Sequence, residues 1–253
     1  MRNLRLIPRL DVKMDWLIKG VQMEGWRKVG DPAEFAKAYA DAGADELLFM
    51  DVVASLYERN SLHDIVRKVA SVVFVPMTVG GGIRTVDDVS AMLACGADKV
   101  ALNTAATHNP NLITEVANRF GAQATVVSIE AIRAKGSWLA MTDNGRNHTG
   151  LDVIKWAKEA ESRGAGELIV TSIDCEGLGR GYDLDLIRRV TEQVNIPVVS
   201  GGGLGNTSHL VDLINKTQAS AVSIAQALHW EKLDMSELRN TLMANDCFVR
   251  RLA

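Results

Sequence analysis

The sequence predicts a (β/α)8 barrel built from two duplicated halves, with residues 1–253 forming a single domain. The first observation is an internal repeat: Val75–Arg84 (VPMTVGGGIR) and Ile196–Gly205 (IPVVSGGGLG) read almost alike and lie 196 − 75 = 121 residues apart. Glu46–Leu48 and Glu167–Ile169 keep the same offset, 167 − 46 = 121. The second observation is that eight short apolar runs alternate with amphipathic helical stretches. The alternation favours a parallel sheet, and the repeat favours closure into a barrel over an open sheet.

The eight apolar runs have the length and composition of buried parallel strands. They are nearly continuous in Val, Ile, Leu and Ala, as expected for strands covered on both faces. The predicted strands are Leu4–Val12, Glu46–Asp51, Val75–Val79, Lys99–Leu102, Thr125–Ile129, Glu167–Ser172, Pro197–Ser200 and Ala221–Ile224.

Three of the intervening helices have clear start and stop signals. A capping residue or an early proline opens them, and a glycine ends them. The predicted helices are Ala33–Ala42 after the Asp31-Pro32 start, a helix opened by Thr85 and closed by Gly96, and Thr149–Arg163 stopped by Gly164.

Composition and charge favour a globular protein and argue against a nucleic-acid-binding, membrane-spanning or secreted one. The chain has 47% hydrophobic and 23% charged residues, as expected for a globular protein with a large core. A net charge of −3 gives no electrostatic footprint for nucleic acid. No apolar run reaches the roughly 18 residues of a membrane span, and the basic N-terminal segment lacks the apolar core and cleavage site of a signal peptide.

The three cysteines, Cys95, Cys175 and Cys247, are widely spaced along the chain. Their spacing matches neither a metal-binding pattern nor a disulfide framework. We therefore expect no metal and no cofactor, and a reducing, cytoplasmic location.

Asp11 and Glu130 are the candidate catalytic residues, because each ends a predicted strand on an opposite side of the barrel. They lie 130 − 11 = 119 residues apart, close to the repeat offset. Two facing carboxylates in different environments can divide the work of general acid and general base. The alternative is that either one only forms a hydrogen bond with a loop.

The glycine turns Gly80–Gly82 and Gly201–Gly203 are candidate phosphate sites. Their exposed amides can bind phosphate, although tight strand-to-helix turns need glycine without any ligand. Asn103-Thr104 and Ala225-Gln226 would complete the two sites. Two equivalent phosphate sites suggest a substrate with a phosphate at each end.

Four charged residues fall at the starts of predicted strands, on the opposite face of the barrel. They are Arg5, Glu46, Lys99 and Glu167, and their formal charges sum to zero. They could form an ion-paired ring that closes this face, because charges buried there would be costly unless paired. The alternative is four separate, solvated strand ends.

The run of motifs along essentially the whole chain resembles the cyclase subunit of imidazole glycerol phosphate synthase. The matching segments are LDVK (Leu10–Lys13), GDPAEFAKAYADAGADEL (Gly30–Leu47), VGGGIRT (Val79–Thr85), GADKVALNTAA (Gly96–Ala106), TGLDVIKWAKEAESRGAGEL (Thr149–Leu168), TSID (Thr171–Asp174), GYDLDL (Gly181–Leu186) and IPVVSGGG (Ile196–Gly203). The resemblance implies a half-barrel duplication that takes ammonia from a glutaminase subunit through the barrel. It also implies closure of an imidazole ring on a bis-phosphorylated ribulosyl aminoimidazole carboxamide.

The same resemblance implies roles for individual residues. Asp11 and position 130 would be the catalytic carboxylates, Lys19 would lie near the substrate in a mobile first loop, and Asp98 would face the glutaminase. The ammonia gate would be Arg5, Glu46, Lys99 and Glu167, and substrate or phosphate contacts would come from Gly81, Gly82, Asn103, Thr104, Thr171, Gly177, Gly202 and Gly203.

The departures from the family pattern lie on the substrate face. Glu130 and Glu176 replace aspartates, Ala225 replaces a serine, and Arg9 stands where a small residue is usual and would bring bulk and charge near the catalytic end of its strand. A displacement of about 1 Å at a catalytic group can cost about two orders of magnitude in rate. The exchange at position 130 is therefore not neutral.

Three functions fit these observations. The first is the ammonia-dependent cyclase of histidine biosynthesis. The second is an ammonia-delivering paralogue that serves a sugar amidotransferase of surface-polysaccharide synthesis, which the segments RLDVK, VVASLYERN and SIEA resemble. The third, the related isomerase with the same duplicated barrel, is disfavoured because it needs no ammonia gate.

Overall fold

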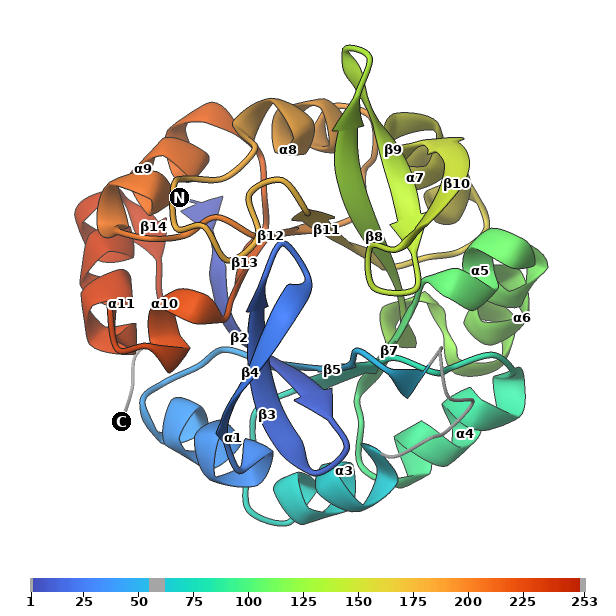
Figure 1. The fold of residues 1–253 in the computed structure, drawn as a ribbon, viewed down its shortest axis with the longest axis horizontal. Helices are drawn as coiled ribbons and strands as arrows, with labels where there is room; N and C mark the ends of the chain where they lie inside the picture. Colours follow the sequence, from blue (N-terminus) through green and yellow to red (C-terminus); the bar gives the residue numbers. More distant parts are fainter. Residues whose placement is uncertain (1, 55–61, 251–253) are drawn as a thin grey trace.

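The computed structural model describes residues 2–54 and 62–250, and within them eight parallel strands close into a barrel (Figure 1). Closure is complete because the last strand pairs with the first, Val222 of β13 lying beside Leu6 of β2. This arrangement confirms the predicted fold class. In order around the barrel, the strands are β2 (Arg5–Lys13), β5 (Leu47–Asp51), β6 (Met77–Gly80), β7 (Lys99–Leu102), β8 (Thr125–Ala134), β11 (Glu167–Ser172), β12 (Val198–Gly201) and β13 (Ala221–Ile224).

All eight predicted strands are present; half of their ends match the prediction, and all but one of the others differ from it by one or two residues. The largest difference is β8, predicted to end at Ile129, which continues to Ala134. It does so because its second half pairs with a further, antiparallel strand outside the barrel. Glu130 therefore lies in the middle of a strand, where its neighbours on both sides fix its backbone.

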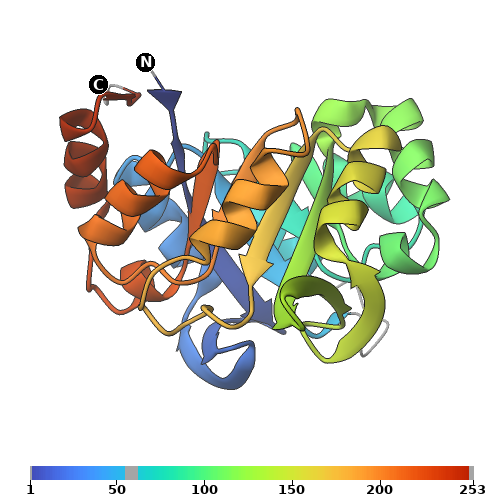
Figure 2. The ribbon, with the colours of Figure 1, turned by 90° about the horizontal axis from the view of Figure 1, so that it is seen from above.

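Two antiparallel hairpins, which the sequence did not predict, rise from the first and fifth barrel strands. One consists of β3 (Trp16–Val21) and β4 (Glu24–Gly30), and the other of β9 (Ser137–Thr142) and β10 (Asn147–Asp152). Both extend beyond the carboxyl ends of the barrel strands, and the two termini lie at the opposite end (Figure 2). The hairpins therefore cover the face on which barrel enzymes place their active sites.

The helices form an outer ring around the barrel (Figure 1). They pack one face on the strands, and the interface forms the main apolar core. None of the helices in the described segments is long and apolar enough to cross a membrane. The helices are α1 (Pro32–Asp41), α3 (Leu62–Ala70), α4 (Val86–Ala94), α5 (Thr104–His108), α6 (Asn111–Phe120), the short 3-10 helix η1 (Ala122–Ala124), α7 (Val153–Ser162), α8 (Leu184–Thr191), α9 (Thr207–Lys216), α10 (Gln226–His229) and α11 (Met235–Ala244), and a small pair, β1 (Arg2–Asn3) and β14 (Cys247–Phe248), lies beside the termini.

The duplication extends to the helix caps. Asp31 caps α1 and Asp152 caps α7, each through hydrogen bonds from two backbone N–H groups, and the two lie 152 − 31 = 121 residues apart. The prediction of a helix over Thr149–Arg163 was therefore wrong at its start, because residues 147–152 form β10 and helix α7 begins at Val153. The predicted start of α1 at Asp31 and the Thr85 cap of α4 are both confirmed.

Candidate active site

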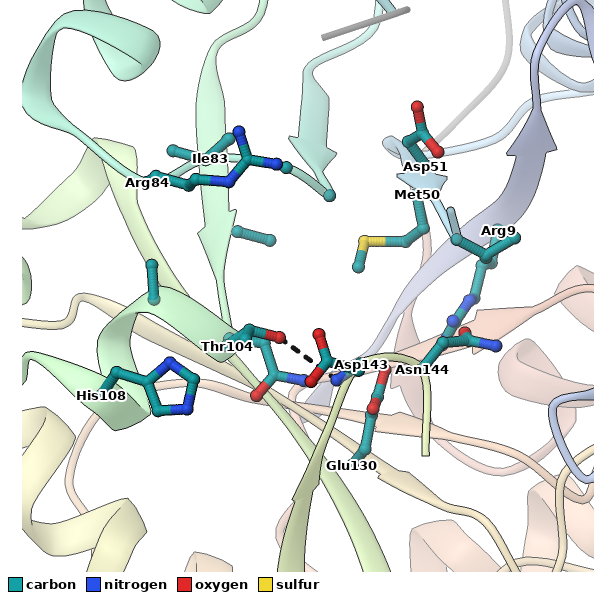
Figure 3. A pocket seen from close by; sticks show the side chains of 16 residues that line it. Arg9, Met50, Asp51, Ile83, Arg84, Thr104, His108, Glu130, Asp143 and Asn144 are labelled. Carbon is teal, nitrogen blue, oxygen red and sulfur yellow. Dashed lines mark hydrogen bonds between the residues drawn. The ribbon is translucent and has the colours of Figure 1, made fainter. Parts of the chain in front are cut away.

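A cavity of about 450 Å³ opens at the carboxyl ends of the first-half strands (Figure 3). Its walls come from the glycine turn after β6, the start of α5 after β7, and the turn between β9 and β10 that folds back over it. Four of the predicted phosphate contacts line it together: Gly81, Gly82, Asn103 and Thr104. The structure therefore brings the residues of the first candidate phosphate site into one cavity.

The glycine turn after β6 has a structural reason of its own. Gly81 has a φ of +96°, and a Cβ placed on it would lie 2.2 Å from the carbonyl oxygen of Asp51. Only glycine fits so close to the neighbouring strand end. The packing therefore needs glycine at Gly81 without any ligand, and the same turn lines the cavity.

The corresponding space in the second half is nearly filled. Gly177, Gly202 and Gly203 surround a hollow of about 20 Å³, together with Ala225 and Gln226. This is room for about one water molecule. The two halves thus share a backbone design but differ greatly in the space they enclose.

Asp11 and Glu130 have opposite electrostatic environments. Burial works to raise the pKa of the Asp11 carboxyl, but Arg9 and Lys19 hold that pKa below its ordinary value. Arg9 Nε donates to Asp11 Oδ1 at 2.7 Å, and Lys19 Nζ lies 3.8 Å from Oδ2. Burial raises the pKa of Glu130 to about 7, although Arg9 and a hydrogen bond from the Gly145 N–H to Oε2 (2.8 Å) oppose the shift. Near neutral pH, one carboxyl is ionised and the other is close to half protonated.

The Arg9 side chain lies inside the site, between the two spaces, and is not exposed at the surface. It is buried, and it lines both the first cavity and the small second hollow. In addition to the hydrogen bond from Nε to Asp11, the Arg9 Nη1 donates to Thr171 Oγ1 at 3.1 Å. This second bond links β2 with β11. Burial would lower the pKa of Arg9, but Asp11 and Glu176 raise it above its ordinary value, so the guanidinium stays charged.

Lys19 lies on strand β3 of the first hairpin, so the segment expected to be the first loop forms a strand at this position. Its side chain is buried and its ammonium forms a salt bridge with Glu176. The pair joins the hairpin to the loop after β11. No pattern in the sequence could reveal this contact, because the two residues are 157 positions apart.

At the opposite end of the barrel, the four predicted charges form a closed ring. Lys99 Nζ lies 2.9 Å from Glu46 Oε2 and 2.8 Å from Glu167 Oε2, and Arg5 binds the other oxygen of each carboxylate. These are ion-paired side chains rather than separate solvated strand ends. Above the ring the interior is apolar, with a layer that includes Ile7, Leu48, Val126, Ile169, Val199 and Ala221.

Asp98 lies on this same face, next to the ring residue Lys99. It is exposed, and its Oδ2 accepts a hydrogen bond from the Met77 N–H at 2.7 Å. One carboxylate oxygen is thus engaged in holding the start of β6.

The sequence profile of the family described as "Histidine biosynthesis protein" matches residues 5–234. This chain belongs to that family. An "Imidazole glycerol phosphate synthase subunit HisF" of Legionella pneumophila is 59% identical over 206 residues, which are 81% of this chain and 97% of that protein. Proteins of the same name from Trichormus variabilis (45% over 253 residues, 98% of each chain) and Nostoc sp. (44% over 254 residues, 99% of this chain and 98% of that protein) span nearly the whole length. The chain is therefore a HisF-type barrel.

Several residues of this HisF-type cavity were not predicted from the sequence. Arg84 and His108 line it from the first half, and Asp143 and Asn144 reach it from the β9–β10 turn. Asp143 is held there by a hydrogen bond from its N–H to Thr104 Oγ1 at 3.2 Å (Figure 3). These two turn residues reach the cavity because the β9–β10 hairpin, which was not predicted, folds back over it.

Replacing Glu130 by glutamine is expected to change how stability depends on pH. The pKa of Glu130 rises from 4.5 to about 7 on folding, so wild-type stability falls as pH rises from 4.5 to about 7 and this loss then stays constant. The loss corresponds to about 3 kcal/mol. Glu130→Gln removes it and keeps an oxygen for the Gly145 N–H. In urea unfolding from pH 4.5 to 8, the free energy of unfolding of the variant should rise relative to that of the wild type. A difference that stays constant across this range would contradict the burial argument.

Proposed function

We propose that this chain is the cyclase subunit of an imidazole glycerol phosphate synthase. It would use ammonia to convert a bis-phosphorylated ribulosyl aminoimidazole carboxamide into imidazole glycerol phosphate and aminoimidazole carboxamide ribotide. The observation that carries the proposal is that oppositely perturbed carboxyls, Asp11 and Glu130, stand at one end of a HisF-type barrel whose other end is an ion-paired ring. Similarity to HisF-named relatives over nearly the whole chain supports the same assignment.

The chemistry divides naturally between the two carboxyls. Ring closure with ammonia requires removal of a proton from the attacking nitrogen and delivery of a proton to the departing one. Asp11, held ionised by Arg9 and Lys19, suits the role of base. Glu130, whose pKa is raised to about 7, suits the role of acid and lies in the wall of the cavity.

One substrate phosphate would bind in the first cavity, against Gly81, Gly82, Asn103 and Thr104. The other would bind near Gly177, Gly202 and Gly203, with Lys19 as the cation and Thr171 beneath the middle of the substrate. Arg9 would lie below the substrate, because it borders both spaces. Backbone amides and a nearby cation are the usual means of holding a phosphate.

The partner would be a glutaminase subunit that docks on the face carrying the ring. A hollow of about 460 Å³ opens there, lined by Arg5, Lys99 and Glu167 together with Asn3 and Gln123. Ammonia released into this hollow would pass the ring of Arg5, Glu46, Lys99 and Glu167 and then the apolar interior, which favours neutral ammonia over ammonium. Asp98 would contact the partner. The compartment we propose is the cytoplasm, in keeping with three free cysteines.

A second function is favoured by one specific observation. Arg9 is bound to Asp11 and the second phosphate site is almost filled, whereas the ring at the other face is intact. A barrel that delivers ammonia to a separate sugar amidotransferase would need the ring but not an open substrate site. Part of the segment VVASLYERN that resembles such paralogues, residues 55–60, lies outside the described residues.

Turnover of the bis-phosphate substrate by this subunit alone, with ammonium salt in place of glutamine, tests the first function. Formation of both products at a rate well above the uncatalysed reaction supports the cyclase. Absence of product, with a folded protein that still binds the substrate, would refute the cyclase and favour ammonia delivery. The Asp11→Asn protein serves as the negative control, because it lacks the proposed base.

A further inference from the structure

The two halves of the barrel differ most at their anion sites. The turns Gly80–Gly82 and Gly201–Gly203 occupy equivalent places after β6 and β12. Even so, the first borders a cavity of about 450 Å³ and the second a hollow of about 20 Å³. The side chain of Glu176, from the loop after β11, lines the small hollow.

Glu176 places its carboxylate against the second glycine turn. A Cβ on Gly202 would lie 3.1 Å from Glu176 Oε2, so this oxygen rests beside the turn's backbone. The side chain of Glu176 is 8% exposed and that of Lys19, its salt-bridge partner, 3%. The carboxylate thus lies between a cation and the glycine turn. The same two groups are those that favour the binding of a phosphate.

The first hairpin is fastened to the same loop through its backbone. Gln22 N–H donates to the Glu176 carbonyl oxygen at 2.9 Å, and a Cβ on Gly177 would lie 2.7 Å from Gly20 O. The hairpin therefore lies directly on the site. A phosphate could enter only if Lys19 exchanged its partner, because two anions sharing one buried cation repel each other strongly.

We propose that Glu176 is a specificity-determining residue that occupies the second anion site of the free protein. The terminal phosphate of a substrate has to replace it on Lys19. Free chain then binds a phosphate readily at the first site and poorly at the second. This rests on the proposed function for the second phosphate's role, but the occupancy of the site by Glu176 can be measured without any turnover.

The test is a titration of the full chain with inorganic phosphate, followed by the backbone amide NMR signals of Gly81 and Gly82 against those of Gly202 and Gly203. In wild type, the second pair should respond only at phosphate concentrations at least tenfold higher than the first. In Glu176→Gln, which leaves Lys19 next to Asp11, the second-site dissociation constant should fall at least tenfold. The first site should not change.

Two further variants keep the result interpretable. Glu176→Asp retains the charge on a shorter side chain and should give an intermediate second-site affinity, which remains informative if Glu176→Gln folds poorly. Glu115→Gln, on the exposed side of α6, removes one charge far from the site and should resemble wild type. Equal affinity of both sites in wild type, or no gain in either Glu176 variant, overturns the proposal. A wild type that shows the expected titration but forms no product would refute the cyclase and not the role of Glu176.

Discussion

Replacing Asp11 with asparagine is expected to reduce ammonium-driven turnover by about two to four orders of magnitude, the usual contribution of a positioned general base. The variant keeps the shape of the side chain but cannot accept the proton. Arg9 Nε can still donate to the remaining oxygen, as it does at 2.7 Å in the wild type. Substrate binding should therefore change by less than about threefold, and the loss should fall on kcat.

The pH dependence of the same reaction distinguishes the two carboxyls. When rates are compared at the same concentration of free, unprotonated ammonia at every pH, kcat/KM, which reports the free enzyme, should show the pKa of about 7 at Glu130 as a limb that falls tenfold per pH unit above about 7. The sign follows from the role of acid: the protonated form persists up to that pKa and is lost above it. Glu130→Gln should be slow and flat across the same range. A limb that rises through pH 7 would instead make Glu130 the base.

Asp143→Asn is the matched control for both variants. Asp143 also lines the cavity. In the wild type, its charge makes a minor contribution to the raised pKa of Glu130. We expect the substitution to remove this contribution and to leave Asp11 unaffected. Turnover should fall less than tenfold, and the falling limb should shift slightly to lower pH. A loss as large as that of Asp11→Asn would mean that the assignment of the catalytic pair is wrong.

The barrel strands were predictable because burial on both faces leaves a strong signal. β5, β11 and β13 are unbroken runs of buried residues, and β11 and β13 were predicted with the same ends that the structure shows. The outer strand of each hairpin carries no such signal, because β4 and β10 are exposed or half-exposed. Strands without a buried face have no reason to alternate apolar and polar residues.

The turn of the first hairpin also lacks the residues that are usual at such a turn. Gln22 and Met23 join β3 to β4 with φ values of 51° and 63°, where asparagine and glycine are the common choices. The lack of a prediction for the hairpins also limited what could be predicted of the site. Asp11 and Glu130 could be proposed because they lie at the ends of predicted strands, whereas the contacts of Glu176 and Asp143 depend on hairpins that were not predicted.

Replacing Lys99 with alanine is expected to separate glutamine-driven from ammonium-driven turnover. Lys99 bridges Glu46 and Glu167 at 2.9 and 2.8 Å, and without it these two carboxylates share only Arg5. Repulsion between them should open the ring and admit water, in which ammonia is protonated and escapes. In the complex with the glutaminase, product formed per glutamine consumed should fall at least tenfold.

We expect ammonia supplied from solution to enter through the cavity at the hairpin face, without passing the ring. Its turnover by Lys99→Ala should therefore stay within about twofold of wild type. Lys216→Ala serves as the matched control, because it removes an exposed lysine that is paired with Asp212 at 2.6 Å on α9; such surface pairs contribute about 0–1 kcal/mol, so both reactions should be unchanged. If Lys99→Ala lowered the glutamine-driven and ammonium-driven rates equally, the ring would be a structural closure of the barrel and ammonia would have to enter by another route.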